Sequence, residues 1–326
     1  MTQNFSEDEL LPYKLSGLLY APAINLGVAK KIVNKEYPAL TSVSFCLEDS
    51  IMDDSLHKAE SALFSTLEFI RKNTNEFPLI FVRIRNPQHM EYMHNFLGEN
   101  EEILTGYILP KFDLSNASKY LRLIKKFNQN RPKKLYIMPI LESQMIAYKS
   151  TRLNILTAVK EIINEMREYV LNVRVGGNDF SNIYGLRRSS EQTIYDIGVI
   201  RDILVDIINI FASDYVVSGA VWEYFGNNPD DKWAEGLKRE LTLDRLNGFI
   251  GKTAIHPSQL PIIYESMKVS QSDYNDAVQI LNWTSDSFGV CKSENGSRMN
   301  EVKCHSKWAK RIKILGDIYG IKEDIK

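Results

Sequence analysis

Eight short apolar runs recur along the chain, each followed by turn residues and then by a segment with helical spacing. The runs lie at 17–23, 42–48, 79–84, 106–111, 135–142, 173–179, 215–221 and 251–257. Near-continuous apolar runs are typical of parallel strands that are covered on both faces. Between the runs, as in 194–212, apolar residues recur every three or four positions, which predicts amphipathic helices. Eight such units over about 250 residues predict an α/β protein with a (β/α)8 TIM barrel, with an open doubly wound sheet as the alternative.

The chain continues beyond the eighth run. Residues 272–283 again have helical spacing, 285–303 are rich in Ser, Gly and Asn and predict a linker, and the tail from His305 returns to helical spacing. We therefore expect a catalytic barrel over 1–270 and a C-terminal helical extension over 271–326. We expect this extension to be a lid over a barrel mouth, its own or a neighbour's in a homo-oligomer. The other interpretation is a helix that only covers the outside of the barrel.

Composition narrows the class of partner. The 40 basic and 41 acidic residues nearly cancel, so no broad field favours nucleic acid or an anionic membrane. No run approaches the roughly 20 apolar residues of a membrane span, and the polar, acidic start does not resemble a signal peptide. Cys46, Cys291 and Cys304 are too few and too scattered for a disulfide framework. We expect a cytoplasmic protein.

Ionisable side chains lie at the ends of six of the eight runs. They are Glu48 and Asp49, Arg83 and Arg85, Lys111, Glu142, Asp179, and His256. The carboxyl ends of barrel strands meet at one rim, where active sites of this fold lie. Any one of these residues could simply mark a strand that ends in a polar loop. Together, these charged side chains would repel one another or lose hydration unless they bound a ligand. A hard cation together with an anionic substrate would balance both the negative and the positive side chains.

Two of these carboxylates are suited to a metal ion. Mg²⁺ takes oxygen ligands and keeps several waters, so two carboxylates are its usual share from a protein. Glu142 and Asp179 end consecutive runs, and we expect them to bind Mg²⁺, with Mn²⁺ as a possible substitute. Glu48 and Asp49 could hold waters of the ion from across the mouth. Zinc is not expected, because no His/Cys cluster has ligand spacing.

The remaining polar residues suggest how an anionic substrate is held. Arg83 is suited to bidentate binding of a carboxylate. The glycines that precede Asp179 would allow a substrate to approach the backbone closely. Besides Arg83, we expect the substrate to contact Gly177, Asn178, Arg187 and Arg188. For His256, a structural and a catalytic role are both open.

The same residues, in order, resemble the HpcH/HpaI aldolase and citrate lyase β-subunit family. The likeness runs from about residue 16 to about 265 through LLYAPA, CLEDSI with Lys58-Ala59, FVRIRN, ILPK, PILES, GGNDFS and GKTAIHPSQL. It implies a TIM barrel and metal-dependent carbon–carbon lyase activity. It also implies that Glu142 and Asp179 are metal ligands, that Arg83 binds substrate, and that Glu48 and Asp49 are the acidic pair near the metal.

Two departures from that family point to an atypical bacterial branch of carbon–carbon bond lyases. Leu15-Ser16-Gly17 stands where citrate lyase β-subunits commonly have Arg-Ser, and the segment 182–188 is longer and more basic. The acyl carrier is therefore open.

The expected reaction is cleavage or formation of a carbon–carbon bond next to a carboxylate, through an enolate that the metal stabilises. The substrate is a small anionic oxo or hydroxy acid or its acyl thioester. The expected catalytic residues are Arg83, Glu48, Asp49 and Lys111, with Lys111 protonated and binding an anion rather than forming an imine. The general base is open. The alternatives are a non-catalytic barrel that binds metal and metabolite, and a nucleotide-binding or phosphoryl-transfer enzyme suggested by the basic residues near 187.

Overall fold

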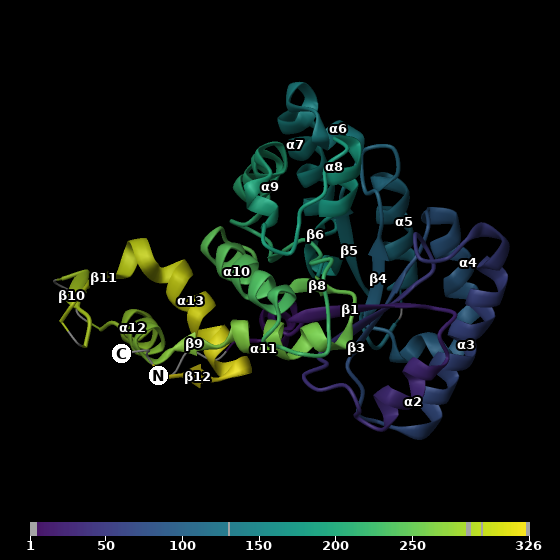
Figure 1. Ribbon diagram of the computed structural model, residues 1–326, viewed down its shortest axis with the longest axis horizontal. Coiled ribbons are helices and arrows are strands. Elements are labelled where there is room, and N and C mark those ends of the chain that lie inside the picture. The colour runs from purple at the N-terminus through teal and green to yellow at the C-terminus, as the bar shows by residue number, and fades with distance from the viewer. Residues whose placement is uncertain (1–4, 130, 285–287, 295, 324–326) are drawn as a thin grey trace. The chain divides into compact units, whose positions relative to one another are not determined.

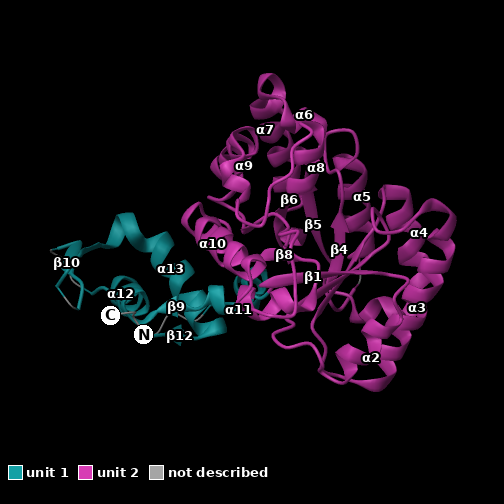
Figure 2. Cartoon of the chain, in the orientation of Figure 1, with its two compact units in different colours: residues 1–14, 264–326 teal, residues 15–263 magenta. Residues whose placement is uncertain are grey.

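The computed structural model describes residues 5–129, 131–284, 288–294 and 296–323. The chain forms two compact units, which Figure 2 colours separately. The barrel unit is residues 15–263, and the extension unit is residues 1–14 together with 264–326. Residues 5–14, which the sequence assigned to the barrel, therefore pack with the C-terminal segment. No helix in the described ranges is long and apolar enough to cross a membrane.

Eight parallel strands form the barrel (Figure 1). They are β1 (Gly17–Pro22), β2 (Ser42–Cys46), β3 (Leu79–Arg83), β4 (Gly106–Leu109), β5 (Tyr136–Leu141), β6 (Val173–Val175), β7 (Val217–Ser218) and β8 (Lys252–Ala254). The order is β7-β6-β5-β4-β3-β2-β1-β8, and a parallel bridge between Gly219 and Lys252 joins the two ends of this order. The bridge closes the sheet, so the predicted TIM barrel is confirmed and the open sheet is wrong.

Helices follow the strands and cover them from outside (Figure 1). They are α2 (Gly27–Val33), α3 (Leu56–Asn73), α4 (Pro87–Leu97), α5 (Ala117–Phe127), α6 (Gln144–Ala147), α7 (Lys149–Glu165), α8 (Gly177–Ile183), α9 (Gly198–Phe211), α10 (Lys232–Leu246) and α11 (Leu260–Met267). In α9, the buried residues Ile200, Ile203, Leu204, Ile207 and Phe211 recur every three or four positions. That stripe is the pattern that lets a helix pack on a sheet.

The extension unit is helical with short strand pairs. It contains α1 (Glu7–Leu10), α12 (Gln271–Leu281) and α13 (Val302–Tyr319), an antiparallel pair of β10 (Val290–Lys292) and β11 (Met299–Glu301), and a parallel pair of β9 (Val269–Ser270) and β12 (Ile321–Lys322). The predicted helices are confirmed. In place of the predicted linker over 285–303, the described part forms the β10–β11 pair, and 285–287 and 295 lie outside the described residues.

The N-terminal segment is tied to α13 by polar contacts. Lys310 Nζ lies 2.6 Å from Glu9 Oε1, and the Tyr319 hydroxyl donates to the Tyr13 carbonyl at 2.5 Å. These contacts explain why residues 1–14 belong to the extension unit although they precede the barrel in sequence.

Candidate active site

A cavity of about 210 Å³ opens at the carboxyl ends of the barrel strands. Its lining comes from β1, β3, β5, β6 and β8 and from the segments that follow β2, β5, β6, β7 and β8. Polar side chains in the lining are Tyr20, Asp49, Arg83, Glu142, Arg174, Asn178, Asp179 and Thr253. Ligand sites in barrels of this fold lie at this end.

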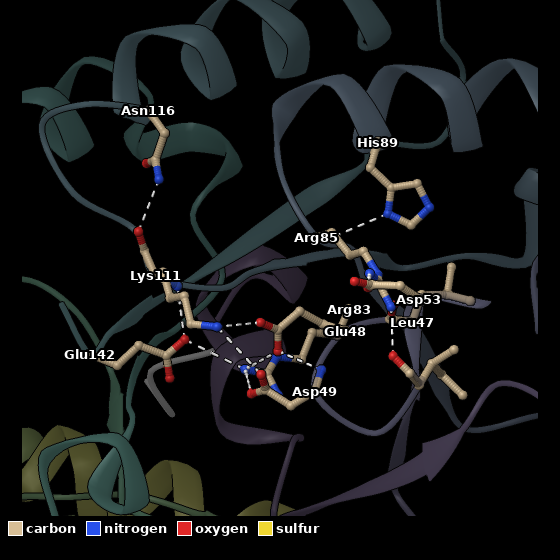
Figure 3. A network of polar contacts seen from close by, with 11 residues as sticks. Leu47, Glu48, Asp49, Asp53, Arg83, Arg85, His89, Lys111, Asn116 and Glu142 are labelled. Atoms are coloured by element: carbon tan, nitrogen blue, oxygen red, sulfur yellow. Dashed lines mark hydrogen bonds and ion pairs between the residues drawn. The ribbon is translucent and has the colours of Figure 1, made fainter. Parts of the chain in front are cut away.

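Five predicted side chains meet beside the cavity and form what we call the rim cluster: Glu48, Asp49, Arg83, Lys111 and Glu142 (Figure 3). Nη2 of the buried Arg83 lies 2.8 Å from Glu48 Oε2, 3.0 Å from Asp49 Oδ2 and 3.5 Å from Glu142 Oε1. Nζ of Lys111 lies 2.6 Å from Glu48 Oε1 and 3.3 Å from Asp49 Oδ1. The two cations therefore offset most of the negative charge that three carboxylates bring to one place.

The backbone at Lys111, just after β4, has an unusual conformation that places its N–H beside this cluster. Lys111 has a φ of 48°, in the left-handed region that a side chain with a Cβ seldom adopts. Its N–H donates to Glu142 Oε1 at 2.8 Å, and its carbonyl accepts from Asn116 Nδ2 at 2.9 Å. Such conformations cost about 1–3 kcal/mol and persist where the surroundings enforce them, often at functional sites.

Arg85 braces the loop that carries Glu48 and Asp49. Its Nε donates to the Leu47 carbonyl at 2.8 Å, its Nη2 donates to the Ile51 carbonyl at 2.6 Å, and its Nη1 pairs with Asp53 (Figure 3). Arg85 therefore helps to fix the position of the loop that carries Glu48 and Asp49.

Glu142 and Asp179 face each other across Gly176. A Cβ atom on Gly176 would lie 2.3 Å from Glu142 Oε2 and 3.0 Å from Asp179 Oδ2, so only glycine allows both carboxylates to approach there. Asp179 lies in the first turn of α8 and not on a strand, because β6 ends at Val175 and α8 begins at Gly177. The prediction that Asp179 belongs to the sixth strand is wrong, but its carboxylate still lies beside that of Glu142.

The charge state of this pair is perturbed. Burial raises the pKa of Glu142 to about 8, against the attraction of Arg83 and with a further rise from Asp179. Burial also raises the pKa of Asp179. Burial disfavours ionisation of both carboxyls, which lie side by side. A divalent cation bound between them would favour their ionised forms.

The donor set fits Mg²⁺ or Mn²⁺. Glu142 and Asp179 offer oxygen atoms only, and the cavity beside them leaves room for the waters that Mg²⁺ keeps. Within the described ranges, no group of three or more His, Cys, Asp or Glu side chains could hold a metal ion. The two carboxylates match the usual protein share for Mg²⁺.

Besides Arg83, two of the predicted substrate contacts lie in the cavity and two do not. Gly177 and Asn178 line it. Arg187 is exposed and lies 3.3 Å, Nε to Oε1, from Glu223. Arg188 is 2% exposed and does not line the cavity. The geometry therefore does not support a substrate role for either arginine.

Arg188 belongs to a buried ionic cluster under the barrel wall. Its Nη2 lies 3.2 Å from Glu240 Oε1. Lys252 Nζ lies 2.8 Å from the same oxygen and 2.6 Å from Asp244 Oδ2. Two cations thus balance two carboxylates, which joins α10 to β8 and leaves no charge for a ligand.

His256 has a structural position. Its Nδ1 accepts from the Ser258 N–H at 3.2 Å, and its ring stacks on Phe225 with centroids 4.5 Å apart. Burial lowers the pKa of His256. The ring thus caps the turn after β8, which favours the structural role.

Arg174 was not predicted. It lies in the middle of β6, is 2% exposed and lines the cavity. Its Nη2 donates to Thr253 Oγ1 at 2.6 Å, and its Nη1 donates to Asn172 Oδ1 at 3.5 Å. Burial lowers the pKa of Arg174, while the Tyr20 hydroxyl acts in the opposite direction. The available signal was one basic residue inside the run 173–179.

Solved structures share this fold at low sequence identity. A citrate lyase from Burkholderia xenovorans LB400 matches with a TM-score of 0.66 and 13% identity, over 95% of this chain and 93% of that chain. CitE from Mycobacterium tuberculosis, in complex with magnesium, acetoacetate and coenzyme A, matches with a TM-score of 0.60 and 19% identity, over 94% and 100%. RipC from Yersinia pestis matches with a TM-score of 0.54 and 16% identity, over 80% and 99%. At these identities the likeness shows the fold.

Sequence comparison gives the family. No curated protein has significant sequence similarity to the chain. The family model described as C-C bond lyase of the TIM-barrel fold matches residues 9–321, which include the barrel unit and most of the extension unit. The chain therefore belongs to the family of C-C bond lyases of the TIM-barrel fold.

Proposed function

We propose that this protein is a Mg²⁺-dependent lyase that breaks or forms a carbon–carbon bond next to the carboxylate of a small oxo or hydroxy acid or its acyl thioester. One observation carries the proposal. Two carboxylates of raised pKa, Glu142 and Asp179, converge over Gly176 at the mouth of a cavity that also contains Arg83. The two carboxylates offer oxygen ligands for a hard cation, beside a guanidinium that can bind an anion.

Glu142 and Asp179 would hold the ion directly, and Glu48 and Asp49 would hold its waters. Bound there, Mg²⁺ would supply positive charge beside the oxygen on which negative charge develops as the bond breaks. CitE from Mycobacterium tuberculosis was solved with magnesium, acetoacetate and coenzyme A, and also with magnesium and pyruvate at a TM-score of 0.52. These relatives of the fold support the choice of metal and of small acids.

Arg83 would orient the substrate carboxylate. Its Nη2 is shared among three carboxylates, while its buried Nε has no hydrogen-bond partner among the described residues. An incoming carboxylate would accept hydrogen bonds from guanidinium donors that the protein leaves unpaired. Lys111 would remain protonated, because Glu48 and Asp49 raise its pKa against the effect of burial. A protonated amine cannot form an imine, so Lys111 serves as a positive charge at the rim.

Asp49 is the best placed side chain to accept a proton from a substrate hydroxyl. It lines the cavity and its side chain is 53% exposed. Burial alone would raise the pKa of Asp49, but its hydrogen bond with Glu48 and the charge of Arg83 lower it. It is therefore ionised at neutral pH and able to accept a proton.

The two alternative functions, phosphoryl transfer and binding without catalysis, require different residues in the cavity. A phosphoryl-transfer enzyme loses its supporting residues, since Arg187 and Arg188 do not line the cavity. A non-catalytic barrel that binds metal and metabolite keeps the whole site and lacks only turnover.

Incubation with a panel of 2-hydroxy and 2-oxo acids and their coenzyme A thioesters tests the proposal. We expect a carbon–carbon cleavage product that forms with Mg²⁺ and not with excess chelator. Arg83→Lys should lose that product at unchanged Mg²⁺ affinity, because a single ammonium cannot replace the guanidinium fork. Saturable binding of a panel member without any product would favour the non-catalytic barrel instead.

A further inference from the structure

The cavity contains a cation that the protein does not neutralise. Five cationic side chains in the described ranges are buried: Arg83, Arg152, Arg174, Arg188 and Lys252. Four of them have carboxylate partners at 2.6–3.2 Å. Arg174 has no acidic partner in the part of the chain that the structure describes.

The partners of Arg174 are all neutral. Its guanidinium donates to Thr253 Oγ1 and Asn172 Oδ1, and its buried Nε has no hydrogen-bond partner among the described residues. Tyr20 is the other polar neighbour. A guanidinium is always charged in proteins, and a buried charge without a counter-ion is strongly unfavourable.

Lys252 shows how this barrel neutralises a buried cation elsewhere. It lies on β8 next to Thr253, is 0% exposed, and touches two carboxylates. It does not line the cavity, whereas Arg174 does. The buried cation without a carboxylate thus lies where a ligand can reach it.

Arg174 and Arg83 share one small space. Both line the cavity of about 210 Å³, and Tyr20 adjoins both, with Arg83 Cζ 5.7 Å from its ring centroid. That volume lies below the range of about 300–1,000 Å³ typical of sites for larger ligands, so it suits a short acid. One short molecule could therefore present an anionic group to each arginine.

We propose that Arg174, with Thr253 and Tyr20, forms a second carboxylate subsite, so that the preferred ligand is a short dicarboxylic hydroxy or oxo acid. One carboxylate lies by Arg83 and the metal ligands, and the other binds Arg174. This assignment rests on the proposed function for the first carboxylate only.

Calorimetric titration with malate and lactate in Mg²⁺ tests the subsite, because malate is lactate with one carboxylate added. A hydrogen-bonded charge pair contributes about 1.5–3 kcal/mol, which corresponds to a ratio of roughly ten- to a hundredfold. We expect wild type to bind malate at least about tenfold more tightly than lactate. Arg174→Gln should bring malate to the affinity of lactate and leave the affinities for lactate and Mg²⁺ unchanged.

Two further variants control the result. Arg201→Gln removes an exposed arginine from α9 and should keep the wild-type ratio. Arg174→Lys keeps the charge without the fork and should keep part of the preference, which covers the case in which Arg174→Gln does not fold.

The subsite is overturned if wild type does not distinguish malate from lactate, or if folded Arg174→Gln still does. It is also overturned if inorganic phosphate, and not malate, binds in a manner that depends on Arg174. Failure of the proposed function would give a different result. If the protein shows no turnover or does not bind Mg²⁺, the lyase proposal fails, but the ratio of the affinities for malate and lactate still reports on Arg174.

Discussion

The affinity for Mg²⁺ should rise steeply between pH 6 and pH 8, because Glu142 must lose a proton before it can bind the ion. Glu142 is 4% exposed, and burial raises its pKa to about 8 from an ordinary value of 4.5. A raised carboxyl pKa means that the metal-free folded protein holds this proton at neutral pH. Mg²⁺ therefore has to displace it.

The size of the effect follows from that pKa. The ionised fraction of Glu142 is about one half at pH 8 and about one hundredth at pH 6, so the apparent affinity falls roughly fiftyfold, or about 2 kcal/mol. The same shift affects folding. Because the folded state holds the proton more tightly than the unfolded state, Glu142 destabilises the metal-free protein progressively as pH rises from about 4.5 to about 8.

Calorimetric titration of Mg²⁺ at pH 6, 7 and 8, in two buffers of different ionisation enthalpy, measures both the affinity and the protons released. We expect close to one proton per ion at pH 6 and about half a proton at pH 8. Glu142→Gln should bind weakly at every pH and lose most of this proton release, whereas Glu91→Gln, on the exposed face of α4, should behave as wild type. Equal affinity at pH 6 and pH 8 without proton release would refute the assignment of Glu142.

Three other predictions follow from the geometry. Gly176→Ala should weaken Mg²⁺ binding by about 10–100-fold, as loss of support for a metal ligand does, since its Cβ would collide with Glu142; Gly198→Ala, where the added Cβ meets nothing within 4 Å, should leave titration curves unchanged. Lys252→Met leaves buried carboxylates short of a cation and should cost about 3–5 kcal/mol in urea denaturation, so a change below 1 kcal/mol would contradict the ionic cluster. If the extension is a lid, deleting 292–326 should abolish turnover while Mg²⁺ still binds, and full activity would show that it only covers the outer surface.

The sequence predicted the barrel well because each strand has its own apolar run, which stays visible without tertiary information. The residues at which the strands and the linker end were less predictable. The run 173–179 continues past Val175 into a helix, since Gly176-Gly177 can end a strand or begin a helix with equal ease. In the region 285–303, polar and small residues that suggest a linker also suit the turn of the β10–β11 pair.

The rim cluster could be predicted because charges at the ends of parallel strands must converge. Charges elsewhere could not be assigned in the same way. Arg187 and Arg188 are identical neighbours in sequence, but one is exposed and the other is buried against Glu240, a partner 52 positions away. Arg174 lies inside a strand with no motif around it, so only the packed barrel reveals that it faces the cavity.

The central claim is that Glu142 and Asp179 bind the metal. Anomalous diffraction from crystals grown with Mn²⁺, a substitute for Mg²⁺ that scatters strongly, locates the ion directly. We expect one strong peak bound by both carboxylates at the mouth of the cavity. An ion bound elsewhere, or no peak at a Mn²⁺ concentration that saturates binding in solution, would contradict it.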